Sequence, residues 1–263
     1  MDLGIRGRVA LVAASSRGLG RASAEALAAE GVDLVLCARG EAALRATAAD
    51  IRRAAGVRVV DVVADVATQA GIAAVLLAAE REFGRVDILV TNSGGPPAGP
   101  FEAHATEAWD AAVRANLTSV VELVRGVLPG MRERRWGRIV NVTSIAVKQP
   151  VDNLILSNSV RAAVTGFART LANEVALHGI TVNNVMPGYT RTARVEELAA
   201  RTATLNGTTP DAAFAAWERE IPMGRLGEPA EFGAMVAFLC SAHASYTTGA
   251  SIPVDGGWIK SLL

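Results

Sequence analysis

A short segment with two glycines has the residue types and spacing expected of a ligand site. Residues 9–20 read VALVAASSRGLG. An apolar run typical of a buried strand leads into a turn with Gly18 and Gly20, and residues 21–30 then favour a helix. The first N–H groups and the dipole of such a helix attract anions, and glycine lets a pyrophosphate approach closely. The segment therefore predicts a dinucleotide phosphate site, or alternatively a turn whose glycines serve packing alone.

The elements that would position this turn recur along the chain. Apolar runs predict strands at 9–13, 32–38, 57–63, 86–91, 138–142, 181–186 and 251–254, and helices are expected at 21–30, 41–55, 68–83, 107–134, 154–178 and 228–241. Strands that alternate with helices predict a single α/β domain over residues 1–263. We expect a doubly wound Rossmann-type fold, a parallel sheet of about seven strands with helices on both faces.

The predicted strand ends carry small or polar residues. They are the turn after Ala13, then Arg39, Asp65, Asn92, Ser144 and Pro187. In open parallel sheets, ligands bind outside the carboxyl ends of the strands. Six such ends predict the site more strongly than the glycine turn alone.

Composition excludes several function classes. The 263 residues are 51% hydrophobic. Their formal net charge is +0, so the chain has no excess of positive charge that would favour binding of nucleic acid. The basic residues Arg132, Arg134, Arg135 and Arg138 are interpreted as a solvated helix end and turn. Two distant cysteines fit a reducing compartment. With no signal-like start and no membrane span expected, we predict a cytoplasmic protein.

Several motifs, in this order, resemble the short-chain dehydrogenase/reductase family. They are residues 13–20 (AASSRGLG), Asp65-Val66, Asn92-Ser93-Gly94, Asn116, 137–144 (GRIVNVTS), 182–188 (VNNVMPG), 221–229 and 248–257. The last part is similar to bacterial 3-oxoacyl-carrier-protein reductases. The resemblance implies a cofactor site formed by Ala14, Ser16, Arg17, Gly18, Leu19, Gly20, Asp65, Val66, Asn92, Ser93, Gly94, Pro187, Gly188, Thr190 and Thr192, with no metal.

The end of the second predicted strand indicates which cofactor is used. An NAD site usually has an acidic residue there, which binds the ribose 2′-OH. This sequence has Cys37-Ala38-Arg39 instead. Arg39 and Arg17 suit a 2′-phosphate, so NADP is preferred and NAD is the alternative. The alternative role for Arg39 is an exposed loop residue.

The glycine turn departs from the family pattern in one respect. The family usually has Thr-Gly where this chain has Ala13-Ala14. Alanine keeps the site small, and we expect it to admit the pyrophosphate if the backbone does not need a positive φ there.

The larger departure concerns catalysis. Asn116 and Ser144 match two residues of the family's Asn-Ser-Tyr-Lys set, but Ser157 and Arg161 stand at the tyrosine and lysine positions. The resemblance implies that the missing tyrosine would be the general acid and the missing lysine would bind the nicotinamide ribose. Arg161 can keep the positive charge and bind ribose hydroxyls, but it cannot give up its proton. A serine hydroxyl is a far poorer acid than a phenol, so the site is either weakened or rebuilt.

Two residues outside that helix are candidates to replace the lost acid. Lys148 follows Ser144 by four residues, and Tyr189 follows Pro187-Gly188 at the cofactor edge. We favour Lys148 as the proton source because its flexible stem can reach the oxygen that Ser144 contacts. The alternatives are that Lys148 is a solvated loop residue and that Tyr189 is a wall of the pocket.

Residues 189–220 are expected to form two short helices that act as a substrate lid, the alternative being a surface hairpin.

Together these features predict an NADP-preferring oxidoreductase that interconverts a carbonyl and an alcohol. The alternative is a catalytically weak or inactive NADP(H)-binding protein that acts as a sensor or partner subunit. The resemblance also implies a homotetramer. Eight apolar residues on the helices expected at 107–134 and 154–178 are the candidate interface between subunits. They are Val120, Val121, Val124, Leu128, Val164, Phe167, Leu171 and Val175.

Overall fold

The computed structural model describes residues 2–262, in which one parallel sheet of seven strands runs in the order β3-β2-β1-β4-β5-β6-β7. The strands are β1 Val9–Ala13, β2 Asp33–Ala38, β3 Val59–Val63, β4 Ile88–Thr91, β5 Gly137–Val142, β6 Ile180–Pro187 and β7 Ser251–Val254. The order reverses between β1 and β4, and this switch point places the turn after β1 beside the loop after β4. The predicted doubly wound fold is confirmed.

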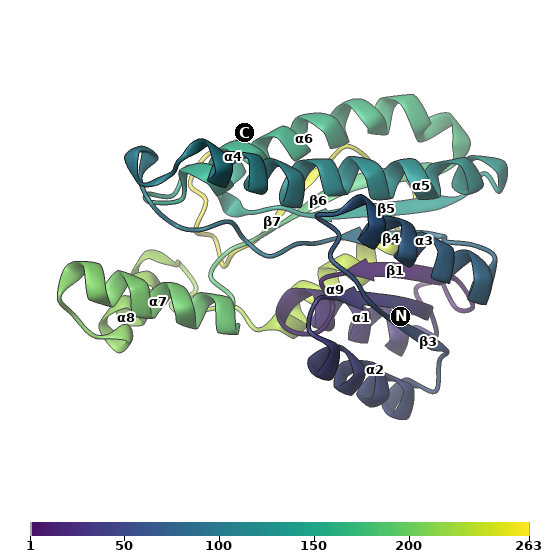
Figure 1. The fold of residues 1–263 in the computed structure, drawn as a ribbon, viewed down its shortest axis with the longest axis horizontal. Coiled ribbons are helices and arrows are strands. Elements are labelled where there is room, and N and C mark those ends of the chain that lie inside the picture. Colours follow the sequence, from purple (N-terminus) through teal and green to yellow (C-terminus); the bar gives the residue numbers. More distant parts are fainter. Residues whose placement is uncertain (1, 263) are drawn as a thin grey trace.

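Helices cover both faces of the sheet (Figure 1). The helices are α1 Gly18–Ala29, α2 Glu41–Ala55, α3 Gln69–Phe83, α4 Thr106–Val113, α5 Ser119–Glu133, α6 Ile155–Val175, α7 Ala193–Asn206, α8 Pro210–Glu220 and α9 Pro229–Cys240. Short 3-10 turns lie at Phe101–Ala103, Ile145–Val147 and Ala176–His178. Helices α7 and α8 project from one end of the molecule (Figure 1). No helix in residues 2–262 combines the length and apolarity needed to cross a membrane.

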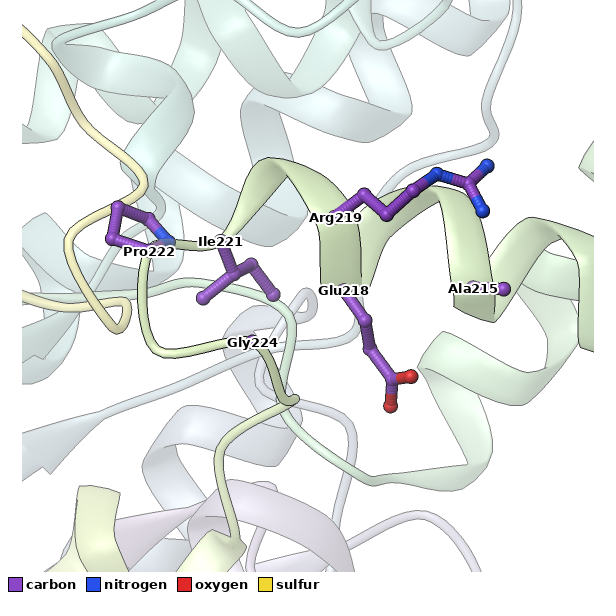
Figure 2. Close-up of a pocket in the computed structure, with 6 residues that line it drawn as sticks. All are labelled: Ala215, Glu218, Arg219, Ile221, Pro222 and Gly224. Carbon is purple, nitrogen blue, oxygen red and sulfur yellow. The ribbon is translucent and has the colours of Figure 1, made fainter.

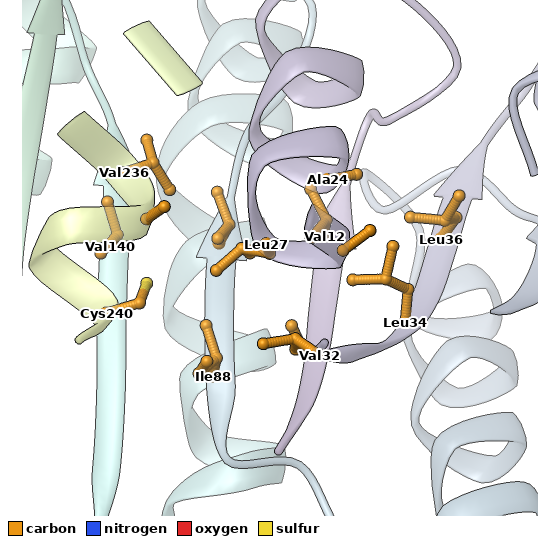
Figure 3. Close-up of a cluster of buried hydrophobic side chains, with 14 of the residues drawn as sticks. Val12, Ala24, Leu27, Val32, Leu34, Leu36, Ile88, Val140, Val236 and Cys240 are labelled. Carbon is orange, nitrogen blue, oxygen red and sulfur yellow. The ribbon is translucent and has the colours of Figure 1, made fainter. Parts of the chain in front are cut away.

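Two apolar cores, one on each face, hold the sheet in place. On one side, Leu27 of α1 and Val236 of α9 pack against Val12, Ile88 and Val140 of the central strands (Figure 3). On the other side, α3, α5 and α6 pack on the opposite faces of the same strands. Central strands are buried on both faces, which explains their nearly continuous apolar runs.

The second core corrects the predicted subunit interface. Of the eight apolar residues proposed for it, five are buried within this core, namely Val120, Val124, Val164, Leu171 and Val175. The helices α5 and α6 are apolar beyond a narrow stripe because they pack against the sheet and against neighbouring helices, not because they expose a second apolar face.

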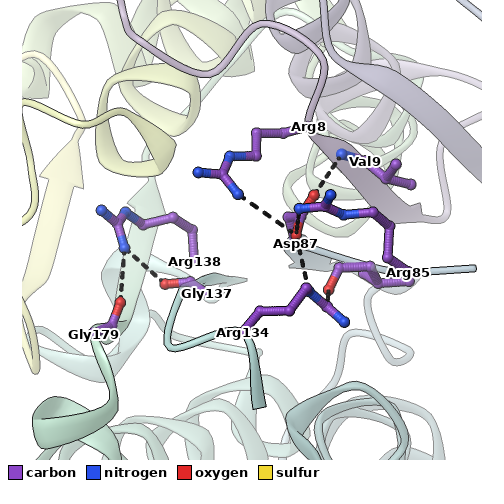
Figure 4. Close-up of polar contacts among 9 residues, drawn as sticks. Arg8, Val9, Arg85, Asp87, Arg134, Gly137, Arg138 and Gly179 are labelled. Atoms are coloured by element: carbon purple, nitrogen blue, oxygen red, sulfur yellow. Dashed lines mark hydrogen bonds and ion pairs between the residues drawn. The ribbon is translucent and has the colours of Figure 1, made fainter. Parts of the chain in front are cut away.

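The basic run at 132–138 is also more than a solvated turn. Arg138 is 3% exposed, and its guanidinium lies 4.5 Å from the centre of the Trp136 ring. Arg134 lies beside the fully buried Asp87, whose Oδ1 also accepts a hydrogen bond of 2.7 Å from Arg85 (Figure 4). These residues hold the amino-terminal edge of the sheet together, opposite to the predicted site.

Candidate functional site

The glycine turn after β1 has the shape of a phosphate site, but at a cost in strain. Helix α1 begins at Gly18, and a Cβ atom on Gly20 would lie 2.3 Å from the carbonyl oxygen of Ala14, which only glycine permits. Ala14 itself has φ of 49°, in the left-handed region. The sequence analysis expected alanine to be tolerated here only if the backbone did not need a positive φ. The backbone does adopt a positive φ, so that condition is not met.

Two other segments close on this turn. The Asn92 side chain, at the end of β4, reaches within 2.9 Å of the position of a Gly20 Cβ. Thr192, the N-cap of α7, lies 3.5 Å from the corresponding position at Gly18. The fold therefore brings four predicted cofactor residues together, namely Gly18, Gly20, Asn92 and Thr192.

The end of β2 presents an available positive charge. The Arg39 side chain is 77% exposed, and its nearest carboxylate is Asp65, 4.0 Å away. Asp65 Oδ1 also accepts a hydrogen bond from the backbone of Ala67, so this carboxylate partly serves its own turn. Arg17 is exposed at the N-cap of α1. The residue that directly follows β2 is Arg39, where an NAD site usually has an acidic residue.

The other predicted cofactor residues lie along the same edge, with differing exposure. Gly94 is exposed, Ser16, Leu19, Ser93, Pro187 and Gly188 are half-buried, and Val66 and Thr190 are buried. Buried Thr190 donates a hydrogen bond to the carbonyl oxygen of Gly188. Whether each of these residues contacts a cofactor stays a prediction.

Asn116 lies where the long helix predicted at 107–134 is interrupted. A single π-turn, Arg114–Thr118, separates α4 from α5. The Asn116 amide donates to the carbonyl oxygen of Ala112, and its Oδ1 accepts a 2.8 Å hydrogen bond from Ser93. Such π-turns are frequent at functional sites. This one joins the helix to the loop after β4.

Arg161, which is predicted to bind the nicotinamide ribose, is buried and already hydrogen-bonded to the backbone. The side chain is 8% exposed, and Nη1 donates to the carbonyl oxygens of Val142 and Thr143 at 2.8 and 3.1 Å. Burial, with a smaller contribution from Arg194, lowers the pKa of Arg161 to about 10. The guanidinium is therefore fixed beneath the end of β5, where Ser144 follows as the cap of the Ile145–Val147 turn.

The two candidate proton sources have opposite environments. Lys148 is exposed at the end of the turn that Ser144 begins, and its ammonium makes no ion pair with the described residues. Tyr189 stacks on Trp217, with ring centres 4.5 Å apart, and meets Trp258 edge-on. Burial, and secondly Glu220, raises the pKa of Tyr189 to about 12. Tyr189 is therefore enclosed by aromatic rings, whereas Lys148 is open to solvent. Ser157 is half-buried on α6.

The stretch expected to form a lid contains two helices, α7 and α8, packed against each other. Arg194 of α7 donates a 2.9 Å hydrogen bond to the carbonyl oxygen of Pro96 and so connects α7 to the loop after β4. Arg194 is the one residue here that the sequence analysis did not select. Its only signal was its place in a stretch with four arginines, because nothing in the sequence pattern shows which of them reaches the loop after β4.

A separate hollow of about 600 Å³ lies at the end of α8 (Figure 2). It is lined by Ala215, Glu218, Arg219, Ile221, Pro222 and Gly224. None of the predicted site residues lines it, so it is not part of the edge described above.

Comparisons with known proteins agree on one type of enzyme. A family model described as enoyl-(acyl carrier protein) reductase matches residues 13–259. The chain is 37% identical to the 3-oxoacyl-[acyl-carrier-protein] reductase FabG of Vibrio cholerae, over 97% of this chain and 98% of that protein. It is 34% identical to a D-beta-hydroxybutyrate dehydrogenase of Cupriavidus necator, over 97% and 99% of the two chains.

Solved structures extend the likeness to the fold. The L-sorbose reductase of Gluconobacter frateurii, crystallised with NADPH and L-sorbose, superposes with a TM-score of 0.95 at 37% identity, and all of both chains is covered. An actinorhodin polyketide ketoreductase variant with NADPH gives a TM-score of 0.93 at 35% identity, over 97% and 98% of the two chains.

Proposed function

This chain belongs to the short-chain dehydrogenase/reductase family of NAD(P)-dependent carbonyl and alcohol oxidoreductases, and from that premise we propose that it reduces a carbonyl compound with NADPH at a rebuilt site. The observation that carries this proposal is a pair of polar contacts at the carboxyl ends of β4 and β5. Ser93 is hydrogen-bonded to Asn116 in the loop after β4, and Arg161 is hydrogen-bonded to Val142 at the end of β5, two residues before Ser144. A protein that only bound the cofactor would not need an ordered polar group beyond the phosphate turn.

The residues present fit the cofactor. The Gly20 contact shows a turn that tolerates no side chain at this position, and α1 starts at Gly18 with its first N–H groups available. Arg39 and Arg17 would hold the 2′-phosphate, and Thr192 would lie against the pyrophosphate. When bound, the reduced nicotinamide supplies the hydride.

The protein's own groups would do the remaining work. Ser144 would orient the substrate oxygen by a hydrogen bond, and the Ser93–Asn116 pair would keep the neighbouring loop in place. Arg161 would bind ribose hydroxyls and favour negative charge as it develops on that oxygen. Lys148 would deliver the proton, directly or through water and Ser157, because Arg161 holds its own proton and Tyr189 is enclosed by aromatic rings.

A screen of ketones and aldehydes with NADPH tests this function. We expect NADPH to bind and to be consumed by at least one carbonyl class, with slower turnover with NADH. Tight NADPH binding without turnover on any carbonyl would instead support the alternative of a cofactor-binding sensor or partner subunit.

The assembly and location proposed for the enzyme are a homotetramer in the cytoplasm. In place of the interface predicted from the sequence, the structure offers the outer face of α9, where Phe238 is 40% exposed, and the open edge strand β7. An exposed aromatic beside an edge strand is a surface that proteins usually cover. Light scattering at micromolar concentration distinguishes a tetramer from a monomer.

A further inference from the structure

Two arginines lie at the carboxyl ends of β4 and β5, which is more positive charge than hydride transfer needs. Arg161 lies beneath the end of β5 and donates to the carbonyl oxygens of Val142 and Thr143. Arg194 reaches the loop after β4 and donates to the carbonyl oxygen of Pro96. Because β4 and β5 are neighbouring strands, both guanidinium groups lie at the same edge of the sheet.

The charge on Arg161 has no protein counter-charge. No carboxylate among residues 2–262 lies within ion-pair distance of it, although the side chain is more than nine-tenths buried. Its Nη1 is occupied by backbone carbonyls, while Nε and Nη2 make no hydrogen bond to the described residues and are not sealed from solvent. The Nε–Nη2 edge is one of the edges by which arginine binds carboxylates with two parallel hydrogen bonds.

Arg194 is also largely available. Its one carboxylate partner is Glu197, 3.7 Å away on the same helix, and both side chains are about half exposed. Such a pair contributes little and is readily exchanged for a better one. On α8, Glu218 pairs with Arg191 and Glu220 accepts a hydrogen bond from Trp258. Among the described residues of α7 and α8, only Glu197 is within ion-pair distance of Arg194 and none is within that distance of Arg161.

We propose that the substrate of this enzyme is an oxo acid, whose carboxylate is bound between Arg161 and Arg194 while Ser144 holds the carbonyl oxygen. This inference rests on the proposed reductase function and names its substrate class. A ribose hydroxyl is neutral and takes one of the free donors of Arg161 without balancing its charge, whereas a carboxylate on the remaining donors would balance it. Electrostatic repulsion from Arg194 adds to the burial that lowers the pKa of Arg161, which agrees with two cations close together at this edge.

Matched pairs of substrates provide the first test. Straight-chain 2-, 3- and 4-oxo carboxylates are compared with their methyl esters, which keep the carbonyl and remove the charge. With NADPH in excess, we expect kcat/KM to favour the acid by tenfold or more. The Arg194→Gln variant should lose that preference mainly through KM, whereas Arg201→Gln, an exposed change farther along α7, should keep it.

A binding measurement separates this inference from the proposed function. The NADPH-loaded protein is titrated calorimetrically with each oxo acid and each ester. Binding of the acid that depends on Arg194 and weakens with added salt supports the anion site even if no turnover occurs, and in that case only the proposed function fails. Equal affinity for acids and esters, or no binding of any acid, overturns the inference.

The Arg194→Gln variant excludes one rival role for this arginine. If it weakens NADPH binding itself and leaves the ratio of acid to ester unchanged, then Arg194 serves the cofactor phosphates and the inference is wrong.

Discussion

Ala14 is held by its neighbours in a backbone conformation that an alanine rarely adopts. The approach of the Ala14 carbonyl to Gly20 fixes the turn, and the turn places Ala14 at φ of 49°. An L-residue with a Cβ is strained there, by about 1–2 kcal/mol for this conformation. The enzyme therefore keeps the phosphate turn at the expense of stability.

Replacing Ala14 with glycine should remove this strain. Glycine adds unfolded-state entropy, which offsets part of the gain, so we expect Ala14→Gly to raise the free energy of unfolding by roughly 1 kcal/mol in urea denaturation. The same change at exposed Ala43, inside α2, should lower it by a similar amount because no strain is relieved there. A loss of stability in Ala14→Gly would show that Ala14 is not strained.

Arg39 allows the cofactor preference to be tested by charge. Its side chain is exposed and only loosely paired with Asp65. An aspartate at this position would repel the 2′-phosphate and could accept a hydrogen bond from a ribose 2′-OH. We expect Arg39→Asp to weaken NADPH binding tenfold or more and to improve NADH binding, measured by fluorescence titration. Arg45→Asp on the neighbouring helix α2 serves as the control, and unchanged selectivity in Arg39→Asp would remove Arg39 from the phosphate site.

Lys148 is the residue on which the proposed proton transfer depends. Removing a general acid typically costs about 10²-fold or more in turnover. We therefore expect Lys148→Met to lower kcat to this extent on an active substrate while leaving NADPH affinity nearly unchanged, whereas Tyr189→Phe costs less. If Lys148→Met has the same kcat as the unchanged enzyme, Lys148 is not the proton source, and Ser157 or solvent must supply the proton.

At the scale of elements, the buried carboxylate of Asp87 connects strands and a helix at the amino-terminal edge of the sheet. Asp87 precedes β4 and is fully buried, and its carboxylate meets Arg85, Arg134 at the end of α5, and Arg8 before β1 (Figure 4). It also accepts a hydrogen bond from the backbone N–H of Val9. One carboxylate therefore fixes the register of two central strands and one helix.

Removing this charge should destabilise the protein without touching the site. Asp87→Asn would leave three partly buried arginines facing one another, and we expect a loss of about 2–3 kcal/mol in the free energy of unfolding, reduced from the fully buried case because the arginines are partly solvated. Glu41→Gln, which breaks an exposed pair with Arg45, should cost under about 0.5 kcal/mol. Equal losses in the two variants would contradict this role of Asp87.

At the scale of the whole molecule, burial of both thiols links folding to alkaline pH. Burial raises the pKa of Cys37 and of Cys240 to about 12, from 9.0. Because the pKa of each thiol is higher in the folded state, the contribution of the thiols to the free energy of unfolding is complete below pH 9. It decreases above pH 9, where the thiols of the unfolded chain ionise and those of the folded protein do not. Tyr189 acts in the same direction above pH 10, whereas Arg161, with its lowered pKa, acts in the opposite direction there.

We therefore expect the free energy of unfolding to fall between pH 9 and pH 10, by up to about 1.4 kcal/mol per pH unit for each thiol. The Cys37→Ala, Cys240→Ala double variant should show a flatter decline over this range, whatever its stability at pH 7. An unchanged slope would show that neither thiol is held protonated by the fold.

The sequence alone determined the architecture, because periodicity and glycine turns are local signals that the sheet reproduces directly. Buried runs such as Val9–Ala13 and Ile88–Thr91 became the central strands, and the residues after them met at one edge. The family motifs then identified the cofactor type. The π-turn at Asn116 was less predictable, since Asn116 is hydrogen-bonded to Ser93 in the loop after β4, a segment distant in the sequence.

Only the tertiary structure decided what the charged residues do. The sequence contains 26 lysines and arginines, and nothing in its pattern distinguishes Arg194, which reaches Pro96 98 positions away, from exposed Arg201. The burial of Arg161, the positive φ of Ala14 and the enclosure of Asp87 likewise result from segments distant in the chain. Desolvation, strain and charge pairing depend on which groups the fold brings together, so local pattern does not encode them.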